Sequence, residues 1–164
     1  MADTSVLFIQ KSRALLMTDY LPKIELSLAP LTDGDVWWRP NPVSNSIGNL
    51  MLHLAGNVTQ WILGGVAGRP YARTRQQEFD ERTPFPKSDL VARLSSVVLE
   101  ADGVIARLDA AALTERRQIQ RYDVSVLEAV YHVVEHFGMH TGQIILLSKA
   151  RSAQDLALWR PPSA

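Results

Sequence analysis

Four stretches of the sequence carry apolar residues at α-helical spacing, and this periodicity constrains the fold more than any other feature. The clearest stretch is residues 46–65, where the apolar side chains fall on one face: Ile47, Leu50, Leu54, Val58, Trp61 and Ile62. Residues 88–109 and 125–150 repeat the pattern, and residues 5–30 show it less cleanly because Pro22 interrupts them. We expect a kink at Pro22 or a restart of the helix just before it. One apolar stripe per helix predicts an all-α fold, a four-helix bundle around a shared core.

Short polar motifs mark where three of these helices begin. Ser125 followed by Glu128 has the spacing of a capping box, in which each side chain binds the other residue's backbone amide. Ser88 is expected to cap the helix of residues 88–109. Either Ser44 or Ser46 could cap the helix of residues 46–65.

The connections between the helices are longer than in a plain up-and-down bundle, where about 2–8 residues are common. Residues 31–45 contain two Pro, a Gly and two Trp, which predicts an ordered crossover whose indoles close one end of the bundle. Residues 67–87 and 111–124 are predicted to be polar loops. Connections of this length fit either a bundle with crossovers or loops that build a mouth over one end.

Composition narrows the class of protein. The chain has 164 residues, which suits a single domain with a core of about residues 5–150 and a C-terminal tail, 151–164, whose Trp159 either packs back or frays. The formal net charge is zero, which argues against nucleic-acid binding. There is no apolar run of about 18 residues and no signal-peptide pattern, so we expect a cytoplasmic protein that does not span a membrane. Cysteine is absent, so any metal ligands must be nitrogen or oxygen atoms.

All four histidines lie in two of the predicted helices. His132, His136 and His140 follow one another at four-residue steps, so at about 100° per residue they span a wedge of roughly 80°. His53 lies in the middle of the helix of residues 46–65. A histidine pair on one helix with a third from a neighbour would hold a metal ion and leave coordination positions open, as in reactive sites. Spacing alone leaves the pair open, either His132 with His136 or His136 with His140, and each histidine could instead be an ordinary core residue.

Two segments resemble a known family. Residues 132–145, with His136, His140, Gly142 and Gln143, resemble the last-helix signature of the DinB/YfiT-like superfamily, H-x-x-x-H-x-G-Q. Residues 45–61 are similar to that superfamily's second helix, which carries its single histidine ligand. The resemblance covers roughly residues 5–150. It implies a crossover bundle topology with metal ligands His53, His136 and His140, and it leaves His132 as a core residue or a neighbour of the ligands.

The resemblance also implies a function. It suggests a divalent metal ion, zinc or nickel, a homodimer, and a small-molecule substrate. Characterised relatives use low-molecular-weight thiols such as bacillithiol or mycothiol, so the resemblance implies a thiol-dependent S-transferase or isomerase acting on small electrophiles. The alternative is a non-catalytic metal- or ligand-binding stress-response module. Metal-assisted hydrolysis is chemically open, but the sequence indicates no separate general base for it.

Several further residues are candidates for the site. Asn57, one turn after His53, could line the pocket as a cofactor-binding residue or simply lie at a helix edge. Gln143 could accept a hydrogen bond from the outer nitrogen of a ligand histidine. Glu135 is expected at the surface, and three tryptophans are expected in the core or the pocket wall: Trp37, Trp38 and Trp61.

Two other patterns have weaker interpretations. The arginines of the polar loop could meet an anionic cosubstrate, but a solvated loop is preferred because acidic neighbours offset them; these arginines are Arg69, Arg73, Arg75 and Arg82. The small-residue run from Gly64 to Gly68 could allow close contact between the two subunits of a homodimer.

Overall fold

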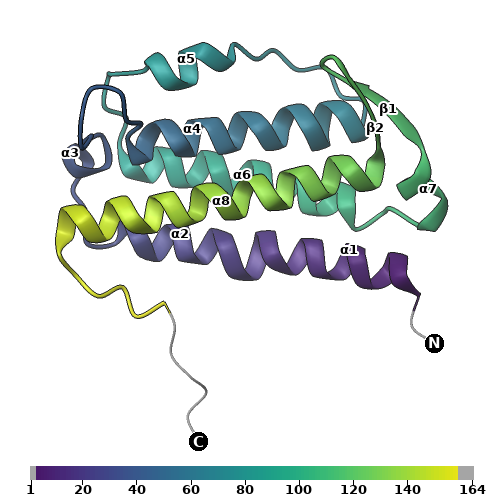
Figure 1. The fold of residues 1–164 in the computed structure, drawn as a ribbon, viewed down its shortest axis with the longest axis horizontal. Helices are drawn as coiled ribbons and strands as arrows, with labels where there is room; N and C mark the ends of the chain where they lie inside the picture. The colour runs from purple at the N-terminus through teal and green to yellow at the C-terminus, as the bar shows by residue number, and fades with distance from the viewer. Residues whose placement is uncertain (1–2, 159–164) are drawn as a thin grey trace, which may run out of the picture.

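The computed structural model describes residues 3–158, and it confirms the predicted four-helix bundle (Figure 1). Two of the four rods contain a wide π-helical turn, and the other two are single α-helices. The rods are α1 (Thr4–Ala14) with η1 (Leu15–Tyr20) and α2 (Leu21–Leu28); α4 (Ile47–Val58) with η2 (Thr59–Val66); α6 (Lys87–Ile105); and α8 (Val126–Ser152). Their buried faces form one core, in which one residue from each rod is 0% exposed: Ile24, Leu54, Leu94 and Phe137.

The first rod continues through Pro22 and does not restart before it. Tyr20 and Leu21 both keep right-handed helical backbone angles, and the Leu21 amide donates to the Leu16 carbonyl across the π-helical turn η1. Proline lacks an amide hydrogen and crowds the preceding turn of an α-helix. Here it occupies the start of α2, next to a turn that is already wide.

The helix starts match two of the three predicted caps. Ser125 and Glu128 form a capping box at α8, and Ser46 forms one at α4 with Asn49. The prediction for Ser88 is wrong, because α6 begins one residue earlier and its preceding residue is a proline without a side-chain cap. The carboxylate of Asp33, from α3 (Asp33–Val36), accepts from the Lys87 amide at 2.9 Å instead. A cap supplied by a distant segment leaves no local signal in the sequence.

Of the two arrangements open for the long connections, the structure shows the bundle with a crossover. Helices α4 and α6 run in the same direction, so the chain must return along the bundle between them, and residues 67–86 do so through α5 (Arg75–Asp80) (Figure 1). Residues 31–46 stay at one end, where the Trp37 indole donates to the Phe85 carbonyl at 3.0 Å. The crossover is therefore 67–86 and not the predicted 31–45, and the segment predicted to be a plain loop contains a helix.

The opposite end of the bundle is closed by α7 (Ala110–Thr114) and a hairpin of β1 (Arg116–Ile119) and β2 (Tyr122–Ser125). The strands are antiparallel, with Ile119 opposite Tyr122. Ile119 packs on Gly65, where a Cβ atom would overlap the isoleucine side chain, and Tyr71 packs on Gly64 in the same way. These glycines thus receive side chains of their own chain, and they give no support to a dimer contact. The homodimer stays a prediction, as does the single-domain assignment.

Two further expectations from the sequence concern membrane-spanning helices and the C-terminal Trp159. Within residues 3–158, no helix is both long and apolar enough to cross a membrane. The expectation for Trp159 lies outside the described residues.

Candidate metal centre

The structure brings three of the four histidines together between α4 and α8. The Nε2 atom of His136 lies 3.1 Å from Nε2 of His53 and 3.1 Å from Nε2 of His140. One ligand atom from each ring lies within 4.8 Å of the others. His53 and His140 are buried, whereas His136 is half-buried. The geometry therefore selects His136 with His140 as the converging pair on α8, an alternative that spacing had left open.

The outer nitrogens of two rings show which nitrogen carries the proton. His53 Nδ1 lies 2.9 Å from the Glu78 carboxylate, and His140 Nδ1 lies 2.6 Å from Gln143 Oε1. Both partner oxygens accept hydrogen bonds, so each Nδ1 donates to its partner. For His53, the Glu78 oxygen at 2.9 Å is nearer than Arg73 Nη2, which lies 3.2 Å from the same Nδ1. In a neutral imidazole the other nitrogen, Nε2, then has a free lone pair. Two lone pairs thus point at the same place, an arrangement that a cation would satisfy.

The separations of His136 Nε2 from the other two Nε2 atoms fit a metal ion. Two nitrogens bound at about 2.1 Å to one ion, with an angle between a right angle and a tetrahedral angle, lie about 3.0–3.4 Å apart. The two 3.1 Å separations fall within that interval. An all-imidazole donor set suits zinc, nickel, copper and iron, so the site does not select one metal.

His136 differs from the other two in its surroundings. Its Nδ1 atom is buried without a hydrogen-bond partner among the described residues. Burial, and to a smaller extent the neighbouring His140, His53, His132 and Arg73, together lower the pKa of His136 to about 3. Burial also lowers the pKa of His140, despite its bond to Gln143. Both rings are therefore neutral near pH 7, the form that coordinates a metal.

An ion pair from the crossover segment covers the outer side of His53. Arg73 Nε donates to Glu78 Oε1 at 2.7 Å, and Arg73 Nη2 donates to Glu78 Oε2 at 2.8 Å. Burial alone would raise the pKa of Glu78, but the hydrogen bonds from Arg73 and His53 outweigh it, and the pKa is lowered. Glu78 is thus an anion held between an arginine and a histidine ring.

Sequence reasoning missed this pair. The sequence favours a solvated loop for Arg73, yet its side chain is 6% exposed and that of Glu78 is 13% exposed. The overlooked signal is Gly56, which lies inside a helix where glycine costs roughly 1 kcal/mol relative to alanine. Such a glycine usually has a packing reason, and here it faces Arg73 and Glu78.

His132 and Asn57 lie one turn away from the converging nitrogens. Asn57 is 4% exposed, and its Nδ2 atom lies 3.3 Å from His132 Nε2, while its Oδ1 atom has no partner among the described residues. The His132 ring contacts Trp61, with 4.1 Å between ring centroids. Asn57 therefore contacts the histidine that does not converge on the cluster, and its cofactor-binding role stays a prediction.

The remaining candidates lie outside the cluster. Glu135 is exposed, as expected, and Trp61 is buried, whereas Trp37 and Trp38 are half-buried. Arg69 forms an exposed ion pair with Glu100. Arg75 lies over the ring of Phe79, which in turn packs on His53 with 4.6 Å between centroids.

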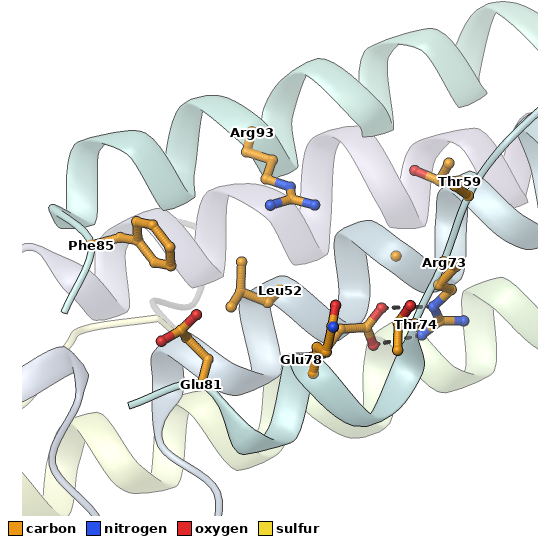
Figure 2. Close-up of a pocket in the computed structure, with 11 residues that line it drawn as sticks. Leu52, Thr59, Arg73, Thr74, Glu78, Glu81, Phe85 and Arg93 are labelled. Atoms are coloured by element: carbon orange, nitrogen blue, oxygen red, sulfur yellow. Dashed lines mark hydrogen bonds and ion pairs between the residues drawn. The ribbon is translucent and has the colours of Figure 1, made fainter. Parts of the chain in front are cut away.

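A cavity of about 400 Å³ lies beside the Arg73–Glu78 pair, between the crossover segment and α6. Figure 2 shows Leu52, Phe85 and Arg93 around it, with the ion pair drawn as dashed lines. None of the three converging histidines lines this cavity. Glu78 therefore borders the cavity and also contacts the outer nitrogen of His53.

Because these histidines are neutral in the folded protein, we expect the free energy of unfolding of the metal-free protein to depend on pH. The pKa of His136 falls from 6.5 to about 3 on folding, so the unfolded chain binds more protons between these values and stability is lost as the pH falls through 6.5. From pH 6.5 to pH 5 this amounts to on the order of 2 kcal/mol at 1.36 kcal/mol per unit. Urea unfolding with chelator present would measure it. His136→Gln should flatten the profile, and a flat profile for the parent protein would contradict the expectation.

Comparison with known proteins agrees with this architecture. A crystal structure of a conserved protein from Enterococcus faecalis superposes with a TM-score of 0.72 at 17% identity, covering 88% of this chain and 97% of that one. At such identity the likeness concerns the fold alone. The comparison with curated proteins found no match. The sequence model of the DinB superfamily matches residues 23–144, which is more than half of the chain. The chain therefore belongs to the DinB superfamily.

Proposed function

We propose that this protein is a divalent-metal-dependent enzyme in which His53, His136 and His140 hold the ion, and that it transfers a low-molecular-weight thiol to a small electrophile. The observation that carries the proposal is the convergence of three Nε2 atoms, two of them fixed as lone-pair donors by Glu78 and Gln143. Three ligands leave coordination positions open, which distinguishes a reactive centre from a closed structural one.

The residues of the chain and the ion would have separate tasks. The ion would act as a Lewis acid that lowers the pKa of a coordinated thiol, so that the nucleophilic thiolate is present at neutral pH. Glu78 and Gln143 hold the rings of His53 and His140 in orientation through their Nδ1 atoms. His136 is the half-buried member of the three, so a cosubstrate would approach the ion from its side. The thiol arrives with that cosubstrate because the chain has no cysteine.

Metal analysis followed by a turnover assay tests the proposal. Protein purified without a histidine tag should carry about one zinc or nickel ion per chain. Bacillithiol, mycothiol and glutathione are then tested with a chlorodinitrobenzene-type acceptor, and thiol consumption should stop on chelation and return with metal. Absence of bound metal would refute the proposal. Bound metal without consumption of any thiol would support the non-catalytic binding module instead.

A further inference from the structure

Glu78 occupies a position between the candidate metal centre and a buried arginine. Its Oε2 atom lies 2.9 Å from His53 Nδ1, and both of its oxygens accept from the Arg73 guanidinium. The third guanidinium nitrogen, Nη1, donates to Gln60 Oε1 at 2.7 Å, so Arg73 is itself fixed on the helix rod that carries His53. The chain of contacts thus runs from Gln60 through Arg73 and Glu78 to the histidine ring.

Room for this pair depends on Gly56, which lies one turn beyond His53 on α4. A Cβ atom built on Gly56 would overlap Glu78 Oε1 and would lie 2.8 Å from Arg73 Nε. An alanine would therefore push the ion pair away from the helix. Glycine at this position has a specific effect, since it lets a carboxylate from the crossover segment reach the outer nitrogen of a histidine on α4.

We infer that Glu78 is a positioning residue for His53, fixed by Arg73 in the recess over Gly56. The inference rests on the proposed metal centre. By accepting the Nδ1 hydrogen, Glu78 keeps the ring in the tautomer whose Nε2 lone pair faces His136 and His140. Carboxylates that orient a ligand histidine in this way typically contribute 10- to 100-fold to metal affinity.

The docking of the segment does not depend on the Glu78 side chain alone. The side-chain amide of Asn49 donates through Nδ2 to the Glu78 carbonyl at 2.8 Å and to the Glu81 carbonyl at 3.1 Å. These are backbone acceptors, so they persist when the Glu78 carboxylate is replaced. A variant of Glu78 therefore keeps α5 on the bundle while it removes the acceptor for His53.

The test compares two uncharged side chains of similar length. Glu78→Gln retains an oxygen that can accept from His53 Nδ1, whereas Glu78→Met has none. Zn²⁺ affinity is measured by competition with a chromophoric chelator. We expect Glu78→Met to bind Zn²⁺ about 10- to 100-fold more weakly than the parent, with Glu78→Gln closer to the parent. Glu81→Met is the matched control on the same segment. It should stay within about twofold, because the Glu81 carboxylate accepts from Arg82 and Thr83 and has no hydrogen bond to the histidines.

A second measurement needs no metal. The ¹⁵N shifts of the His53 ring in the chelator-treated protein report which nitrogen carries the proton. The parent and Glu78→Gln should show protonated Nδ1, and Glu78→Met should shift toward protonated Nε2. If Glu78→Met does not fold, Gly56→Ala replaces it, because its added Cβ displaces the same carboxylate.

The two measurements separate this inference from the proposed function. If the parent binds no Zn²⁺, the proposed function fails, and the ring shifts alone decide whether Glu78 sets the tautomer. An unchanged tautomer in the variant without an acceptor overturns the positioning role. A parent-like Zn²⁺ affinity in that variant, in a parent that binds Zn²⁺, overturns it as well.

Discussion

Replacing His136 with glutamine weakens Zn²⁺ binding roughly 100- to 1,000-fold, while the same change at His132 leaves affinity near that of the parent. Structural zinc sites with four ligands bind with about 10–16 kcal/mol, or about 2.5–4 kcal/mol per ligand, and 1.4 kcal/mol is tenfold. His136 is the common neighbour of the other two Nε2 atoms, at 3.1 Å from each. Without the His136 ring, only the Nε2 atoms of His53 and His140 remain to bind the ion.

His132 is the matched control for this prediction. It lies on the same helix, one turn before His136, with 5.4 Å between the ring centroids, and its Nε2 faces Asn57. Isothermal titration of both chelator-treated variants with Zn²⁺ measures the effect, and circular dichroism checks that both are folded. Equal losses in the two variants would contradict the assignment of the converging set.

The second large effect is on stability. Phe137→Ala should lower the free energy of unfolding by about 3–5 kcal/mol, the usual cost of removing a buried aromatic ring and leaving a cavity. Phe137 is 0% exposed and stacks on Tyr20, with 6.2 Å between the ring centroids. It joins α8 to the first rod, on the helix that also carries His136 and His140.

Urea unfolding of the metal-free proteins measures this loss. Met139→Ala is the control, because Met139 is 49% exposed on the same helix and its truncation should cost less than about 1 kcal/mol. A loss at Phe137 no larger than that of the control would mean that the ring is not a principal core contact.

The bundle and its histidine cluster were predictable because both depend on helical periodicity. The apolar stripes of residues 46–65 and 125–150 fix which faces of α4 and α8 meet, and four-residue spacing brings His136 and His140 to the same side. What spacing could not give was the phase between the two helices, which decides whether His53 meets His132 or His140. That phase is set by packing across the bundle.

The crossover segment was predicted poorly for the opposite reason. Helix α5 has no buried residue, so it shows no apolar stripe, and its sequence is typical of a polar loop. The hairpin turn at Gln120 and Arg121 lacks the glycine or asparagine that would mark it, although Gln120 adopts a φ of 56°. Arg73 and Glu78 are polar residues in a polar stretch, and only their contact with α4 takes most of their side-chain surface out of solvent.

The parallel arrangement of α4 and α6 has a consequence for how such a protein can diversify. A bundle of antiparallel neighbours could join its helices by tight turns and leave its flanks bare. Here the topology requires residues 67–86 to return alongside α4, the helix that carries His53 (Figure 1). Helix α5 of this segment has no buried residue, so the segment contributes little to the core. Its sequence can therefore change without loss of the four rods, and such changes would alter the groups that contact the outer side of the histidines.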